Sequence, residues 1–323
     1  MVRIETTLNE FLKNHRLIEA TSLFKDCLTK AEIIDPDNDK TWAGYADQIS
    51  SIILNHKGEI EFKAFWLDLL GFFKKELEPN WNHLHKGHIL FRLGLAEIGA
   101  DIGTAKKYLE EALEEDRLLE KKRSAPNIEE AIKGYSSYVL LCIIERIEDQ
   151  SFNKPEEKQK FFKELVSQSF DAAIRGQRVD SQLIESCLTK LVPSSTLEQV
   201  LQVKKELDLA NLQALKIATI SLAGSFLENL LLSILHYGYG VQKTSKGKSI
   251  FEIELGPLLE EAIGRNIFPS DSVRTSCKVI HVFRNRLHPG NEIKQKYKLT
   301  VRVASTLKIL LDLTLLEWIR KIP

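Results

Sequence analysis

The sequence has few cysteines, and their spacing excludes the sites that cysteines most often build. Cys27, Cys142, Cys187 and Cys277 lie far apart, and no two of them are separated by two residues. The chain therefore has neither the paired spacing of a zinc clip nor the dense cysteine framework of a disulfide-stapled domain. Free thiols are typical of a reducing compartment, so we expect a cytoplasmic protein with no metal site.

The chain also lacks targeting and cofactor signatures. Residues 1–12 carry three charges and no long apolar core, so we expect no signal peptide. No Walker loop, dinucleotide fingerprint or nucleophile elbow is present, so no cofactor is predicted. Residues 217–242 have Glu228 as their only charge and are almost long enough to span a bilayer. Three serines and Asn229 interrupt this run, which favours a buried helix and no membrane contact.

The formal net charge is zero, but the two ends of the chain differ in sign. The chain has 45 basic and 45 acidic residues, of which 16 basic and 9 acidic residues lie in 209–323. Residues 1–208 keep the other 29 basic and 36 acidic residues. The basic part could face an anion, and the acidic part could repel nucleic acid or mask the basic part. An unevenly charged, solvated surface is the alternative.

Almost every segment has the pattern of a helix. Apolar residues recur at spacings of three and four, alternating β-branched runs are scarce, and Gly and Pro lie mainly between the periodic segments. We predict an all-α protein with two parts. Residues 1–200 form a helical-hairpin, repeat-like domain, and residues 209–323 form a four-helix bundle.

Two expected helices near residue 100 approach each other through small side chains. Leu93 and Gly94 in the first helix, with Ala105, Leu109 and Ala112 in the second, resemble a tetratricopeptide repeat. No neighbouring segment repeats the pattern cleanly, so plain helical packing is the alternative. Because repeat-like arrays usually bind partners, the resemblance implies a protein partner for this region.

The C-terminal part has a simpler plan. The expected helices span 209–236, 254–264, 271–288 and 299–322. The first helix should bury a stripe formed by Leu215, Leu222, Phe226, Leu230 and Ile234. A flexible, basic loop at 237–248 should follow it.

The third of these helices ends in the segment 283–290, Phe-Arg-Asn-Arg-Leu-His-Pro-Gly. A helix would place Arg284 and His288 one turn apart, within reach of one phosphate group. Arg284 falls on the core face of the helix, where an unpaired charge is costly. Glu228, the lone charge of the apolar helix, is its predicted partner. In the alternative, Arg284 only ties two helices together and His288 caps a helix end.

Residues 209–323 resemble the HEPN superfamily of four-helix-bundle proteins. The resemblance rests on the apolar helix around 225–231, the segment 258–262, the motif at 283–290 and the apolar last helix. Many members are cytoplasmic prokaryotic proteins of defence, toxin–antitoxin or RNA-processing systems. The resemblance implies a homodimer in which two motifs form one metal-independent endoribonuclease site.

By this resemblance, Arg284 stabilises the phosphate, Asn285 takes the polar position after it, and His288 performs acid–base chemistry. In active members of the family, the arginine is followed by a polar residue and then usually three more residues before the histidine. This sequence departs from that pattern, because only three residues in all separate Arg284 from His288. Arg274 and His281 have six residues between them, within the usual range, and we interpret that match as chance.

Basic residues around the motif could hold an RNA backbone through salt-sensitive contacts. They are Lys246, Lys248, Arg286, Lys294, Lys296 and Lys298. The alternative for each is an ordinary solvated side chain.

A cluster of three histidines and the four tryptophans are both expected to have structural roles. His83, His85 and His88 cluster, but no nearby residue in the sequence completes a metal-ligand set. The four tryptophans lie in apolar patterns and are expected in the core. They are Trp42, Trp66, Trp81 and Trp318.

The leading hypothesis is therefore an RNA-binding protein that acts as a metal-independent endoribonuclease through its Arg/His motif. The first alternative is a non-catalytic helical scaffold whose bundle dimerises and whose N-terminal part binds another protein. The second is a regulatory module that binds a nucleotide or another anion.

Overall fold

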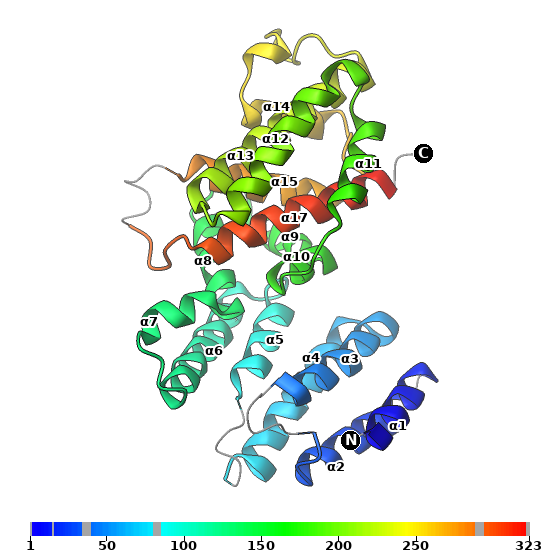
Figure 1. Ribbon diagram of the computed structural model, residues 1–323, viewed down its shortest axis with the longest axis vertical. Coiled ribbons are helices and arrows are strands. Elements are labelled where there is room, and N and C mark those ends of the chain that lie inside the picture. The colour runs from blue at the N-terminus through cyan, green and yellow to red at the C-terminus, as the bar shows by residue number, and fades with distance from the viewer. Residues whose placement is uncertain (1, 15, 34–39, 80–84, 288–293, 321–323) are drawn as a thin grey trace. The chain divides into compact units, whose positions relative to one another are not determined.

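The computed structural model describes residues 2–14, 16–33, 40–79, 85–287 and 294–320. Helices account for nearly all the regular structure in these ranges (Figure 1). No β-strand occurs in them, and Lys243 and Ser249 form one isolated antiparallel bridge. The all-α prediction is confirmed.

The chain divides into two compact units, Met1–Ile132 and Lys133–Pro323. The predicted boundary between 200 and 209 instead falls within helix α12 (Ser194–Leu212), inside the second unit. The difference has a physical cause. Helices α8, α10 and α11 pack against α17 and α9 packs against α15, so the segment before residue 200 shares the core of the C-terminal helices.

The helices of the first unit pack largely in chain order. They are α1 (Val2–Lys13), α2 (Leu17–Thr29), α3 (Lys40–Lys57), α4 (Glu59–Phe72) with the π-helical turn η1 (Phe73–Leu77), α5 (Gly87–Glu97), α6 (Ile102–Lys122) and α7 (Ile128–Ala131). Each helix of this series contacts the next. Trp42 and Trp66 are fully buried, as predicted, and Trp81 lies outside the described residues.

The close approach of α5 and α6 depends on the small residues that the sequence singled out. A β-carbon on Gly94 would lie 2.7 Å from Leu109 Cγ, closer than any side chain tolerates. Ala105, Leu109 and Ala112 are all fully buried along the facing helix. The backbone of α5 can therefore lie directly on α6.

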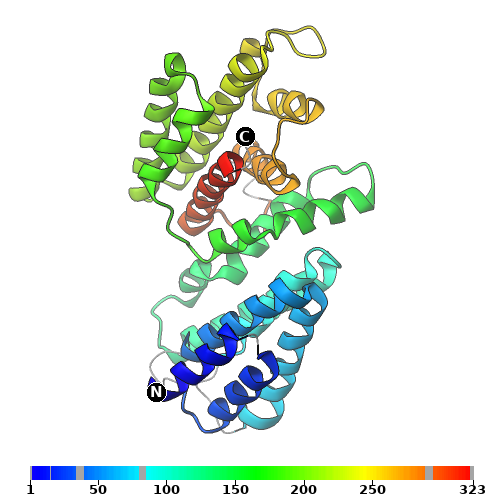
Figure 2. The ribbon, with the colours of Figure 1, turned by 90° about the vertical axis from the view of Figure 1, so that its right-hand side faces the viewer.

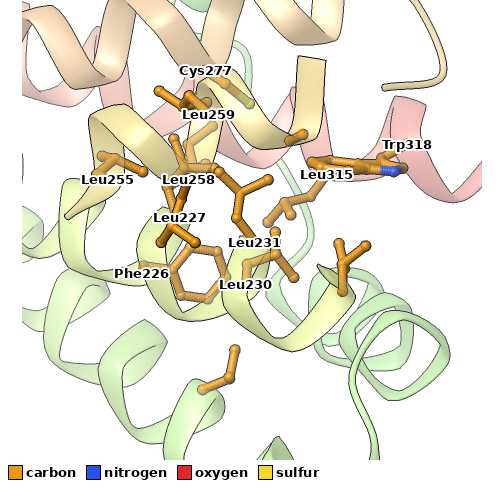
Figure 3. Close-up of a cluster of buried hydrophobic side chains, with 14 of the residues drawn as sticks. Phe226, Leu227, Leu230, Leu231, Leu255, Leu258, Leu259, Cys277, Leu315 and Trp318 are labelled. Carbon is orange, nitrogen blue, oxygen red and sulfur yellow. The ribbon is translucent and has the colours of Figure 1, made fainter. Parts of the chain in front are cut away.

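The second unit is built around α13 (Lys216–Ser233). The surrounding elements are α8 (Ser136–Glu148), α9 (Pro155–Leu165), α10 (Gln168–Ile174), α11 (Ser181–Leu191), α12, η3 (Ile234–Gly238), η4 (Ile250–Glu252), α14 (Leu255–Gly264), α15 (Asp271–Asn285) and α17 (Val301–Arg320); η2 (Ile132–Gly134) precedes them. Helix α13 contacts α12, α14, α15 and α17. Figure 3 shows Phe226, Leu230 and Leu231 of α13 in a cluster with Leu258 of α14 and Trp318 of α17.

The predicted single helix at 209–236 is wrong, because the chain reverses between α12 and α13. Ala214 adopts a left-handed conformation with φ 58°. The Leu215 amide donates to the Ala210 carbonyl at 2.9 Å, and the Ala214 amide donates to Asn211 at 3.1 Å. This is the Schellman arrangement of a helix end, which usually has glycine at the left-handed position. Alanine there gives no sequence signal.

The reversal also corrects the predicted apolar stripe. Leu215 lies in the turn and is 49% exposed, whereas Phe226 and Leu230 are fully buried and Ile234 is nearly so. Leu222 is partly buried against the core cluster.

One element, Lys216–Gly238, is long and apolar enough to cross a membrane by length and composition alone, and 56% of its most apolar window is buried inside the protein. The core helix of a soluble protein passes the same test, so this finding is weak evidence for a membrane span. The packing of α13 on four helices accounts for its composition, and the cellular location stays a prediction.

We predict that Gly94→Ala lowers the free energy of unfolding by about 1–3 kcal/mol, because the new methyl group overpacks the α5–α6 contact. The matched control is Gly71→Ala in α4, where an added β-carbon meets nothing within 4 Å. That substitution should raise stability by up to about 1 kcal/mol through helix propensity. Urea unfolding followed by circular dichroism measures both. Equal stabilisation by the two substitutions would contradict the close contact.

Candidate functional site

Arg284 on α15 reaches across to Glu228 on α13, as the sequence predicts. Arg284 Nη2 lies 2.9 Å from Glu228 Oε2. The two side chains are 29% and 28% exposed, so the pair lies at the surface of the bundle rather than deep in its core. Solvent screening at such a position limits the contribution of the pair to stability to at most about 1 kcal/mol.

Gly224 determines where the Arg284 side chain can lie. It is buried on α13, one turn before Glu228. A β-carbon at Gly224 would lie 2.5 Å from Arg284 Cδ and 2.9 Å from Cγ. The stem of the arginine therefore rests on bare helix backbone, with Glu228 holding its charged end. The sequence signal for this contact was a glycine inside a long apolar helix, which the sequence reasoning passed over.

His281 completes the group that we call the arginine–histidine cluster: Glu228, His281, Arg284 and Asn285. The Asn285 Nδ2 group lies 2.8 Å from His281 Nε2 and can donate a hydrogen bond to it. A β-carbon on Gly256 of α14 would meet His281 Nε2 at 3.0 Å, so the imidazole lies against the backbone of α14. The cluster thus draws its contacts from α13, α14 and α15.

The cluster favours a neutral imidazole. Burial lowers the pKa of His281, and the neighbouring Arg284 charge lowers this pKa further, while Glu260 and Glu254 oppose both effects. A neutral ring is also the form that can accept the Asn285 amide proton at Nε2. His281 is therefore held as a neutral ring whose one basic nitrogen, Nε2, accepts from Asn285.

His288, the predicted acid–base residue, lies outside the described residues. The predicted helix to residue 288 is nevertheless too long, because α15 ends at Asn285 and Arg286 occupies its C-cap. A continuous helix therefore does not set the spacing of Arg284 and His288.

The second Arg/His match, Arg274 and His281, which we interpret as chance, has separate partners for its two members. Arg274 Nη2 lies 2.7 Å from Asp271 Oδ1 and 3.6 Å from Glu164 Oε2 of α9. His281 lies two turns further along α15, about 10 Å along the axis, and contacts Asn285. The structure thus groups His281 with Arg284 rather than with Arg274.

Of the predicted RNA-contacting residues, the lysines have exposed side chains, whereas the one arginine pairs with an acidic residue. Lys246 and Lys248 are exposed in the loop between η3 and η4, and neither forms an ion pair with another described residue. Arg286 instead forms a salt bridge with Asp149 at 3.0 Å.

The segment after the motif is fastened to α8. Glu145 accepts hydrogen bonds from the amides of Lys296 (2.7 Å) and Tyr297 (2.9 Å). The Tyr138 hydroxyl lies 2.8 Å from the Lys298 amide and accepts from it. The side chains of Lys294, Lys296 and Lys298 remain exposed on this fixed backbone.

Two histidines of the first unit, His85 and His88, pair with carboxylates that lie far from them in the sequence. His88 Nε2 lies 3.0 Å from Asp47 Oδ1, and Arg92 donates to Asp47 Oδ2 at 2.8 Å. Burial raises the pKa of Asp47, but His88 and Arg92 outweigh this and bring it down to about 2. His85 pairs with Asp116 at 3.1 Å.

These contacts join helices that are far apart in the chain, so the sequence near the histidines contains no sign of their carboxylate partners. His83 lies outside the described residues. Among the residues that the structure describes, no group of three His, Cys, Asp or Glu side chains could hold a metal ion.

Comparisons with protein-family models, with curated proteins and with solved structures find no match for this chain.

We predict that the His281 imidazole titrates below the ordinary histidine pKa, and that Arg284→Met moves this pKa upward by removing a neighbouring positive charge. Arg274→Met is the matched control, because Arg274 is also 29% exposed on α15. NMR titration of the His281 ring protons measures the shift. A His281 pKa that Arg284→Met leaves unchanged would contradict the cluster.

The same shift predicts how stability depends on pH. The folded-state pKa of His281 lies below the ordinary histidine pKa of about 6.5, so the unfolded chain binds its proton more readily. The contribution of neutral His281 to stability is present above pH 6.5 and is lost as the pH falls below that value. His281→Gln should therefore reduce the loss of stability between about pH 7 and pH 5, measured by urea unfolding at each pH.

Proposed function

We propose that the unit Lys133–Pro323 binds RNA and that the motif at residues 284–288 makes it a metal-independent endoribonuclease. The observation that carries this proposal is the arrangement of Arg284, whose stem lies on Gly224 and whose Nη2 lies on Glu228. An arginine held in this way loses little conformational freedom when it binds a phosphate. Its other guanidinium donors have no partner among the described residues and remain available for phosphate oxygens.

The proposed reaction needs a base, an acid and a stabilised phosphorane. The ribose 2′-hydroxyl attacks the adjacent phosphorus, its proton passes to a neutral imidazole, and the bond to the 5′-oxygen breaks as that oxygen gains a proton. His288 is the proposed base that takes this proton, and His288 of the second copy is the proposed acid that supplies the proton to the 5′-oxygen. His281 lies beside Arg284 and takes no proton in this step, because its Nε2 atom accepts from Asn285. Arg284 stabilises the charge that develops on the phosphate oxygens. Asn285 orients His281 through the contact at Nε2.

The proposal includes a fold and an assembly. The helices α12 to α17 form a HEPN-like bundle that pairs with a second copy, so that two motifs approach each other. The first unit is a repeat-like array that binds a protein partner, and its helices pack on their chain neighbours as such arrays require.

A specific observation favours the alternative of a non-catalytic scaffold. Four aliphatic side chains are exposed at or beside the turn between α12 and α13: Leu209 (53%), Leu212 (82%), Leu215 (49%) and Ile217 (54%). Exposed apolar residues that gather in this way often mark a protein contact. In this alternative the ion pair of Arg284 only joins α13 to α15.

We predict that the purified protein cleaves RNA in EDTA and that Arg284→Ala lowers the cleavage rate by at least about a hundredfold, because a donor to the developing charge is lost. His288→Ala should have a similar effect. Arg274→Ala, in the same helix and equally exposed, should cleave like the wild type. The thermal unfolding of each variant shows whether it is folded.

Two results would overturn the catalytic proposal. The first is cleavage that Arg284→Ala leaves intact. The second is a wild-type protein that cleaves no RNA while Arg284→Ala mainly lowers its melting temperature, which would make the motif structural and favour the scaffold.

A further inference from the structure

All the exposed aromatic side chains of the described residues lie in one short segment. Tyr237, Tyr239 and Phe251 are 48%, 55% and 59% exposed. The other described Phe, Tyr and Trp residues are buried or partly buried. The segment, residues 237–251, lies in the connection between α13 and α14 and projects from one end of the bundle, drawn in yellow in Figures 1 and 2. Large rings are costly to expose, so their concentration at one place indicates a binding surface.

The backbone of this segment is held in place, although the sequence predicts a flexible loop. Val241 and Ile250 are buried at its two ends. The Ile250 amide donates to the Gln242 carbonyl at 3.1 Å, and Lys243 and Ser249 form the antiparallel bridge. The segment is therefore a preformed hairpin, and its exposed side chains need little ordering when they bind a ligand.

A buried carboxylate also anchors the tip of this hairpin. Glu261 of α14 accepts a hydrogen bond from the Ser245 amide at 3.0 Å. Its other oxygen accepts from Arg265 Nε at 2.7 Å. The hydrogen bond from Ser245 is the largest cause of the lowered pKa of Glu261, so the anchor is an ionised carboxylate at neutral pH.

His236 links two of the three rings, Tyr237 and Phe251. Its imidazole lies 4.6 Å from the Tyr237 ring and 4.9 Å from the Phe251 ring, measured between centroids. The His236 Nδ1 atom lies 3.2 Å from the Val241 carbonyl oxygen, which fixes the imidazole between the two. We call Tyr237, Tyr239, Phe251 and His236 the aromatic platform.

The hairpin between Tyr239 and Phe251 carries three lysines and no acidic residue. Lys243, Lys246 and Lys248 are exposed, and none forms an ion pair with a described residue. From residue 229 to residue 251 the sequence contains no Asp or Glu. Glu252 and Glu254 follow Phe251 and carry the nearest negative charges of this connection. The hairpin itself combines flat, exposed rings with an excess of positive charge, which complements unstacked bases joined by phosphates.

We propose that the aromatic platform binds single-stranded RNA, with bases stacked on Tyr237, Tyr239 and Phe251 and phosphates held by the three lysines. The proposal rests on the proposed function and specifies the form of its substrate. Base faces are accessible in single strands but are hidden inside an A-form duplex, so the platform should discriminate against duplex RNA.

The chain connects the platform to the arginine–histidine cluster on both sides. Element η3 continues directly from α13, which carries Glu228. Phe251 lies five residues before Gly256, the residue that touches His281. Five residues of chain span at most about 18 Å, so the α-carbons of Phe251 and Gly256 are no farther apart than that. A strand stacked on the platform could thus place a phosphate a few nucleotides away at Arg284.

Aromatic and basic side chains also suit a membrane surface, but this segment lacks what insertion needs. Its two aliphatic residues beyond the rings, Val241 and Ile250, are buried. Membrane-surface segments present aliphatic as well as aromatic side chains to the acyl region. The observations therefore favour RNA.

The test measures the binding of a fluorescent, 2′-O-methylated uridine 12-mer, which binds as a single strand and resists cleavage, beside a duplex of equal length. The triple variant Tyr237→Ala, Tyr239→Ala, Phe251→Ala should weaken binding of the single strand by at least about tenfold, because base stacking is lost. Changing Lys243, Lys246 and Lys248 to Gln should make the slope of log affinity against log salt shallower by about 2. The matched control, Leu209→Ser with Leu212→Ser, removes exposed apolar side chains elsewhere and should bind like the wild type.

Each outcome decides a separate question. Equal affinity of the aromatic variant and the wild type, or a preference for duplex, overturns the platform. Binding to phosphatidylserine vesicles that the aromatic variant loses, with no binding to RNA, assigns the surface to membranes and also overturns it. Platform-dependent binding by a protein that cleaves no RNA supports the platform and refutes only the nuclease. Cleavage that requires Arg284 but not the three rings refutes only the platform.

Discussion

The architecture of the second unit depends on one constraint: α13 is apolar on most of its faces, and four helices cover those faces. Phe226, Leu227, Leu230 and Leu231 are fully buried in consecutive turns. Burying each such side chain is worth about 1.5–3 kcal/mol, so packing on α13 stabilises α12, α14, α15 and α17. The reversal at Ala214 and the hairpin that leads to α14 both follow, because each returns the chain to this helix.

The single charge of α13 links this packing to chemistry. Glu228 is matched by Arg284, and Gly224 gives the arginine a bare surface on which to lie. A glycine inside a helix costs about 0.5–1 kcal/mol relative to alanine, and a partly exposed ion pair returns at most about as much. Stability alone therefore gives little reason for this arrangement. Fixing a guanidinium at a defined place beside a neutral imidazole supports the proposed role in binding phosphate.

The sequence predicted local features well and longer-range groupings less well. Helical periodicity gave the all-α class, the burial of Trp42 and Trp66, and the small-residue contact at Gly94, because each depends on neighbours along one or two helices. The partner of Arg284 could be found because Glu228 is the lone charge in an apolar run. The carboxylate partners of His85 and His88 were missed, since they lie 31 and 41 residues away in the chain. The boundary of the units differed because α8 to α11 share a core with helices much later in the sequence.

By itself, the sequence determined which segments are helical and which side chains must find a partner, since periodicity and the cost of burying charge act locally. Only the tertiary structure decided which elements meet. In the folded chain, α12 ends just before Ala214, which adopts a left-handed conformation, and α15 ends at Asn285. The packing also places His281 rather than Arg274 beside Arg284. It also gathered Tyr237, Tyr239 and Phe251 on one preformed hairpin. Such groupings depend on how helices pack around α13, and packing is settled by the shape of the whole core rather than by any one segment.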